Sequence, residues 1–176
     1  MRRMRGFTLI ELVVTMVVLA IVVAFAIPNF NTMVRDSRST TLGDDLIAAI
    51  NYARAEAVKR GGRVSLCASS NGTACIGNWT DGWIVFTDGA TSDTAALAVT
   101  TVLRNWEAPN VNASITVTQN GADTNFFRFT GVGALARAGN VVISSKIEGC
   151  TGDSARTITV NRGGVARATN ADCDDE

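Results

Sequence analysis

A continuous apolar run opens the chain and predicts a helix able to span a membrane. The run extends from Phe7 to Ile27, 21 residues, and contains one charged residue, Glu11. At about 1.5 Å per residue it would measure roughly 32 Å as a helix, close to a bilayer core of about 30 Å. Three arginines within the first five residues precede it. This positive charge predicts that the N-terminus stays cytoplasmic and that the chain beyond Ile27 lies across the membrane.

From Asn29 to about Arg60 the spacing of apolar residues changes and predicts an amphipathic helix. Its apolar stripe, which we expect to lie on a sheet, consists of Leu42, Leu46, Ala49, Ile50, Ala53 and Ala57. Pro28 stands at the junction of the two helical segments, where a proline bends or breaks a helix. Lys59 and Arg60 followed by two glycines predict the C-terminal end of the helix.

Beyond Gly62 the period becomes that of strands, separated by clusters of glycine, asparagine and aspartate. The predicted strands are Arg63–Ala68, Trp83–Thr87, Ala98–Trp106, Ser114–Thr118, Asn125–Thr130, Asn140–Ser145, Arg156–Val160 and Val165–Thr169. A helix followed by a run of antiparallel strands is an α+β architecture.

Composition excludes several classes of function. The chain has 176 residues, enough for one domain with a modest core, and no histidine, the commonest general base and metal ligand. Its 16 basic residues balance 16 acidic ones, whereas a basic nucleic-acid binder shows an excess of lysine and arginine. We therefore expect no catalytic residue, no metal, no cofactor and no enzymatic activity.

The N-terminal run admits three interpretations. A cleaved secretory signal has a shorter apolar stretch and a small-residue cleavage site, which Ile27-Pro28-Asn29-Phe30 does not provide. A plain membrane anchor leaves Glu11 unexplained, because a carboxylate within the apolar region costs about 2.5–3.5 kcal/mol and requires a partner.

The third interpretation rests on Gly6-Phe7-Thr8-Leu9-Ile10-Glu11-Leu12, which resembles the type IV prepilin motif after a short basic leader. The resemblance implies cleavage after Gly6 by a prepilin peptidase, followed by N-methylation of Phe7. It implies that Glu11 pairs with the amino group of Phe7 on a neighbouring subunit and so sets the stagger of assembly. A proline at the place of Pro28 marks a kink or locally melted turn in pilins.

Further segments resemble the group of the FimT/FimU minor pilins and GspH pseudopilins. They are Asn51-Tyr52-Ala53-Arg54-Ala55-Glu56-Ala57, Val64-Ser65-Leu66-Cys67 and Gly82-Trp83-Ile84-Val85-Phe86-Thr87-Asp88, with Phe129 and Gly133 also fitting. The resemblance implies the pilin fold, a long N-terminal helix whose outer half packs on an antiparallel β-sheet domain. It divides the chain into a leader (1–6), a transmembrane and assembly helix (7–28), an amphipathic helix (29–62) and a β-rich domain (63–176).

The resemblance also implies a function, a location and partners. We expect a minor subunit that enters a type IV pilus through its N-terminal helix and primes the tip complex or joins it to the shaft. The alternative is a GspH-like pseudopilin of a type II secretion system. In either case the chain is held in the bacterial inner membrane with its domain in the periplasm before it enters the filament. The implied partners are other major and minor pilins or pseudopilins, the prepilin peptidase/N-methyltransferase and the inner-membrane assembly platform.

A second alternative is a FimT-like DNA-binding pilin for natural transformation. Such proteins carry a Gly-Arg-x-Arg stretch near the C-terminus, and the matching segment here runs from Asn161 to Arg167. Arg162 and Arg167 are the candidate phosphate contacts, but this segment does not have the Gly-Arg-x-Arg order. The acidic tail, with Asp172, would repel phosphate.

Four cysteines allow three pairings. We favour Cys67–Cys75, closing a small loop, and Cys150–Cys173, clamping the final hairpin and tail. An even cysteine count suits an oxidising compartment. A zinc site is the alternative, but the chain has neither a C-x-x-C pair nor histidine.

Four other motifs favour a structural interpretation. The glycines of 131–136 resemble a dinucleotide-binding turn but leave no room for the helix that such a turn opens. Asp172, Asp174 and Asp175 lack the surrounding loop of a calcium site. Trp79 and Trp83 are expected to pack in the core or at an edge. The basic group Arg54, Lys59, Arg60 and Arg63 is expected to be a solvated helix end.

Overall fold

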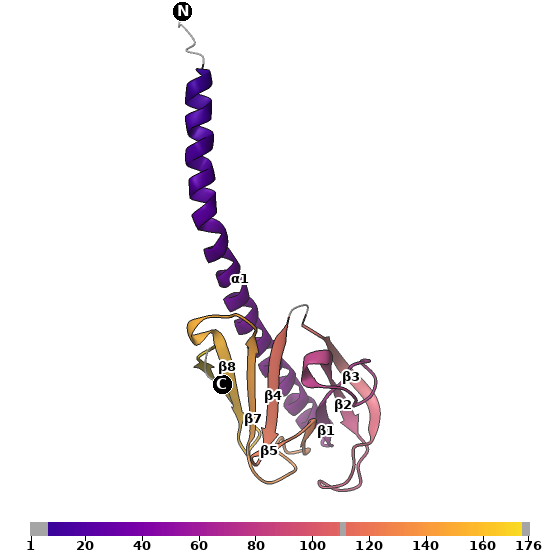
Figure 1. Ribbon diagram of the computed structural model, residues 1–176. Coiled ribbons are helices and arrows are strands. Elements are labelled where there is room, and N and C mark those ends of the chain that lie inside the picture. The colour runs from indigo at the N-terminus through magenta and orange to yellow at the C-terminus, as the bar shows by residue number, and fades with distance from the viewer. Residues whose placement is uncertain (1–6, 110–111, 174–176) are drawn as a thin grey trace, which may run out of the picture. The chain divides into compact units, whose positions relative to one another are not determined.

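The computed structural model describes residues 7–109 and 112–173, except for the side chains of residues 24–29. It forms two compact units, one ending at Val34 and the other beginning at Arg35. Helix α1 (Leu9–Arg60) contributes to both and is continuous through the position of Pro28 (Figure 1).

The first unit is the apolar part of helix α1. Its large apolar side chains are exposed from Leu9 to Val23, including Leu9 at 82% and Ile10 at 67%. A helix that is apolar all round needs a surrounding apolar phase or other helices to cover it. Among the described residues, no helix meets the length and hydropathy required to cross a membrane.

In the second unit α1 presents the predicted stripe to the core. All six of its residues are at most 5% exposed: Leu42, Leu46, Ala49, Ile50, Ala53 and Ala57. The helix ends in a Schellman motif, in which Gly61 N–H donates to Val58 O and Gly62 N–H to Ala57 O, both at 3.2 Å. Gly61 has a φ of +59°, which glycine adopts without steric cost.

The strands form two antiparallel sheets. The four-stranded sheet has the order β3-β2-β1-β6 and the five-stranded sheet the order β5-β4-β7-β8-β9. The first sheet contains β1 (Val64–Ala68), β2 (Gly82–Asp88), β3 (Val99–Glu107) and β6 (Phe126–Phe129); the second contains β4 (Ala113–Gln119), β5 (Ala122–Asp123), β7 (Val141–Ile147), β8 (Ala155–Val160) and β9 (Ala166–Ala171). Two short 3₁₀ helices, η1 (Trp79–Asp81) and η2 (Gly152–Ser154), lie between strands.

The main core joins α1 to both sheets. It includes Leu46 and Ile50 from the helix, Leu66 and Phe127 from the first sheet and Ile143 from the second, all fully buried. Ser39 is fully buried and links α1 to β7 by a hydrogen bond, in which its Oγ accepts the Ile147 N–H at 3.3 Å. The α+β pilin fold is therefore confirmed, and each predicted strand matches an observed one to within two residues at either end. The sequence did not predict the two-residue strand β5.

Candidate assembly and binding sites

The N-terminal assembly segment begins with a capping box. Glu11 N–H donates to Thr8 Oγ1 at 3.3 Å, and Thr8 N–H donates to a Glu11 carboxylate oxygen at 3.5 Å. This is the reciprocal arrangement of a threonine N-cap and a glutamate at the third helical position. Glu11 thus lies where the helix dipole favours negative charge, with oxygen lone pairs left for a cation. Gly6, the predicted cleavage position, lies outside the described residues.

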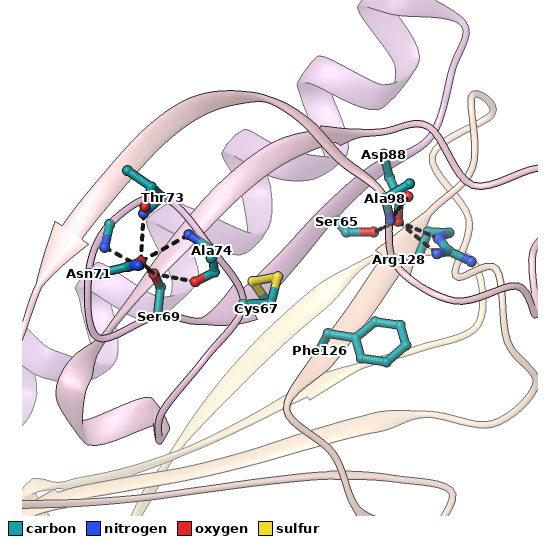
Figure 2. Close-up of a disulfide and its surroundings, with 12 residues drawn as sticks. Ser65, Cys67, Ser69, Asn71, Thr73, Ala74, Asp88, Ala98, Phe126 and Arg128 are labelled. Carbon is teal, nitrogen blue, oxygen red and sulfur yellow. Dashed lines mark hydrogen bonds and ion pairs between the residues drawn. A yellow bond between two sulfur atoms is a disulfide. The ribbon is translucent and has the colours of Figure 1, made fainter.

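Two disulfides join the pairs of cysteines favoured from the sequence. Cys67 and Cys75 have Cα atoms 5.6 Å apart, and Cys150 and Cys173 have Cα atoms 5.7 Å apart. The first disulfide closes a loop around Asn71, whose side-chain oxygen accepts the N–H groups of Thr73 and Ala74 at 3.0 and 2.9 Å (Figure 2). The loop is therefore held by a covalent bond at its ends and by side-chain hydrogen bonds at its centre.

A buried ion pair that sequence reasoning missed holds the connection between β2 and β3 (Figure 2). Arg128 and Asp88 have side chains 1% and 0% exposed, and Arg128 Nη2 lies 2.7 Å from Asp88 Oδ2. The same guanidinium donates to the backbone carbonyls of Ser92, Asp93 and Ala95 at 2.8–3.2 Å. The connection thus wraps around one internal cation.

The environment of Asp88 sets its ionisation. Burial raises the pKa of Asp88, but hydrogen bonds from Ser65, the Ala98 N–H, Arg128 and the Ala90 N–H together hold it below its usual value. The carboxylate therefore stays charged at neutral pH. The signal in the sequence was Arg128 itself, a charged residue inside the aromatic strand Phe126–Phe129.

The basic helix end is partly neutralised. Arg60 Nε and Lys59 Nζ lie 2.7 and 3.4 Å from the Glu56 carboxylate. The hydrogen bond from Arg60 is the main cause that lowers the pKa of Glu56. Arg63 Nε lies 2.8 Å from Asp93 Oδ1, and Arg54 Nε donates to Gly133 O at 3.1 Å. These contacts tie the helix end to neighbouring loops.

The two candidate DNA-binding arginines are exposed on one hairpin. Arg162 lies in the turn between β8 and β9, and Arg167 lies in β9 opposite Thr159. Neither forms an ion pair with a described residue. The turn is anchored through its backbone, because Leu135 N–H donates to Arg162 O at 3.0 Å. Both guanidinium groups can therefore reach an external anion.

The remaining motifs have structural surroundings. The segment 131–136 forms turns and a bridge from Leu135 to Phe129, and strand β7 follows it. Trp79 and Trp83 are buried, and Trp79 Nε1 donates to Thr124 O at 2.9 Å. Asp174 and Asp175 lie outside the described residues. Within the described ranges, no group of three potential metal ligands comes together.

An apolar N-terminal helix with a capped glutamate, continued into an α+β domain, defines a pilin-like subunit. Residues 42–164 match the family model described as Type II transport protein GspH, and residues 1–27 match the prokaryotic N-terminal methylation motif. The chain belongs to the GspH family and is a minor (pseudo)pilin.

Solved structures share the fold. The type IV minor pilin FimU of Pseudomonas aeruginosa aligns with a TM-score of 0.57 and 18% identity over 76% of this chain and 89% of that one. The minor pseudopilin EpsH of the Type 2 Secretion System of Vibrio cholerae aligns with a TM-score of 0.50 and 10% identity over 76% and 97%. No curated protein matches the sequence significantly.

Proposed function

We propose that this minor (pseudo)pilin is a non-enzymatic subunit of a type IV pilus that primes assembly or joins the tip complex to the shaft. The observation that carries the proposal is the match of residues 1–27 to the methylation motif, a segment that contains capped Glu11 and an apolar helix with exposed side chains. Such a helix is stable in a bilayer and in a bundle of similar helices. The likeness to the minor pilin FimU supports the pilus over the secretion pseudopilus.

The processing and assembly steps follow from the same segment. We propose cleavage after Gly6 by a prepilin peptidase, methylation of Phe7 and insertion of residues 7–28 in the inner membrane with the β-rich domain in the periplasm. The assembly platform then extracts the helix into the filament. There the Glu11 carboxylate accepts the Phe7 amino group of a neighbouring subunit, while the bend expected at Pro28 adjusts the helix to its neighbours.

The capping box gives this pairing a sharp test. Glu11→Gln removes the charge and keeps one oxygen acceptor on a side chain of the same size, whereas Thr8→Val removes the hydroxyl of the cap and keeps the charge. If pairing to the Phe7 amino group governs assembly, Glu11→Gln subunits are lost from sheared filaments and Thr8→Val subunits are retained. Equal retention of both variants would refute the ion pair.

Two other functions are each supported by one observation. The family description, Type II transport protein GspH, supports a pseudopilin of a secretion system. Exposed Arg162 and Arg167, without ion partners among the described residues, support DNA binding.

An in-frame deletion separates these functions through three readouts. Loss of surface pili with normal enzyme secretion supports the pilus subunit, and the reverse result supports the pseudopilin. Normal pili and secretion with reduced DNA uptake supports the DNA receptor. In that case, Arg162→Ala with Arg167→Ala should weaken a mobility shift that also falls steeply with salt.

A further inference from the structure

A cavity of about 300 Å³ lies between α1 and the ends of strands β2, β3 and β7, wholly within the second unit. Leu42, Trp83 and Ile147 line it and are 5%, 2% and 3% exposed. Trp106, which is half-buried, stacks on Trp83 with ring centroids 6.5 Å apart. This volume is at the lower end for ligand pockets, so it suits one or two side chains better than a cofactor.

The lining contains a buried donor without a partner. Trp83 Nε1 forms no hydrogen bond with any described residue. The other buried tryptophan, Trp79, has its acceptor in Thr124 O. This nitrogen is itself inaccessible to solvent, so Trp83 contributes the apolar part of its ring to the cavity wall.

The mouth of the cavity carries excess negative charge. Asp45 and Glu107 line it and are exposed, and neither belongs to an ion pair among the described residues; Arg38 is the basic residue of the lining. Burial and the neighbouring Asp44 raise the pKa of Asp45, against the opposing effect of Arg104. The ionised form of Asp45 is thus under-stabilised, and an added cation would stabilise it.

We propose that this cavity receives a short extended segment of a neighbouring pilin-like subunit, with an apolar side chain beside a lysine or arginine. The apolar side chain packs against Leu42, Trp83 and Ile147, and the basic group faces Asp45 and Glu107. The nature of the partner rests on the proposed function, whereas the preference for an apolar and basic pair rests on the cavity alone.

The first test measures that preference on the full-length chain in detergent micelles. The chain has three tryptophans, so ¹⁵N labelling gives three indole N–H signals that substitution can assign. The probes are acetyl-Lys-Leu-amide and its charge-reversed counterpart, acetyl-Glu-Leu-amide. We expect the lysine peptide to shift the Trp83 signal saturably and to bind at least about threefold more tightly, as for an exposed ion pair, while the Trp79 signal stays in place.

Variants of the two carboxylates at the mouth of the cavity provide the control. Asp45→Asn with Glu107→Gln should abolish the discrimination between the peptides, and Asp123→Asn, on β5, should leave it unchanged. Equal binding of both peptides, or no shift of the Trp83 signal at saturating peptide, would overturn the proposal. A shift produced by the neutral disaccharide cellobiose and not by peptide would overturn it in favour of a carbohydrate site.

The second test examines the partner in cells. A photo-reactive benzoylphenylalanine replaces Thr41, an exposed residue of the cavity lining, and a matched subunit carries it at Asp123. We expect position 41 to cross-link in sheared filaments to a pilin-like subunit, through a peptide with a basic residue next to an apolar one. Asp45→Lys with Glu107→Lys should remove this product.

Subunits that enter filaments without this cross-linked product contradict the inference and leave the proposed function standing. Subunits that never enter filaments contradict the proposed function, and the peptide experiment then decides the cavity's preference.

Discussion

Replacing Arg128 by methionine should destabilise the domain far more than replacing any exposed arginine. The substitution keeps much of the side-chain volume but leaves the carboxylate of Asp88 buried without its cation. Removing one partner of a buried ion pair typically costs about 3–5 kcal/mol. The carbonyls of Ser92, Asp93 and Ala95 lose their common donor in the same step.

Arg63→Met is the matched control because Arg63 holds the same connection from a partly exposed position. Its side chain is 32% exposed, its partner Asp93 is 44% exposed, and Arg63 Nη1 also donates to Ala90 O at 3.2 Å. Exposed pairs contribute at most about 1 kcal/mol. We expect urea unfolding of residues 29–176, with both disulfides intact, to show a loss of about 3–5 kcal/mol for Arg128→Met and about 1 kcal/mol or less for Arg63→Met.

The loss should also depend on pH. The folded state lowers the pKa of Asp88, so this group stabilises the fold above its unfolded pKa of about 4, and the contribution disappears as pH falls through the folded pKa. Without Arg128 the effect of burial meets less opposition, and the pKa of Asp88 rises relative to the wild type. The difference in stability between wild type and Arg128→Met should therefore be smaller at pH 3 than at pH 7. A difference below about 1 kcal/mol at pH 7, or one that does not change with pH, would refute this account.

Three further predictions test other parts of the fold. Gly164 and Gly121 share a φ of +79°, but a Cβ at Gly164 would meet Gly133 O while one at Gly121 meets nothing within 4 Å. Thermal unfolding should therefore show Gly121→Ala losing about 1–2 kcal/mol from backbone strain and Gly164→Ala clearly more; equal losses would contradict the steric argument. The disulfides close segments with sequence separations of 8 and 23. Chain entropy then predicts that double Cys→Ser replacement costs about 2.5 kcal/mol for Cys67–Cys75 and about 3.4 kcal/mol for Cys150–Cys173 in denaturant titrations, and the opposite order would count against it. Asp36 accepts the Thr151 N–H and hydroxyl at 2.7 and 3.0 Å, so Asp36→Ala should lower stability by about 1–2 kcal/mol. Exposed Asp44 forms no such bond with any residue that the structure describes, and a similar loss in Asp44→Ala would show that the effect is not specific.

The helix and strands could be predicted because their signals are local. The stripe from Leu42 to Ala57 recurs at helical spacing, and every residue in it is buried. The helix end followed from glycines whose role is set by a left-handed φ, as at Gly61. The division of strands between two sheets could not be predicted. It depends on the long-range pairing of β6 with β1, which no local pattern encodes.

Of the candidate sites, the N-terminal motif could be predicted from the sequence and the buried ion pair could not. The motif around Glu11 is local, and the Thr-x-x-Glu spacing from Thr8 to Glu11 is likewise a local signature of the capping box that the structure shows. Arg128 was missed because alternation places it on the strand face opposite Phe127 and Phe129, and no local pattern predicts what covers that face. The connection between β2 and β3 covers that face.

Mass spectrometry of sheared pili, from cells whose pilus retraction is blocked, tests whether this chain is a processed subunit of the filament. We expect the pili to contain this chain in small amounts, with an N-terminal peptide that begins at N-methylated Phe7. Chain that still begins at Met1 and stays in the membrane fraction, with pili free of it, would contradict the claim.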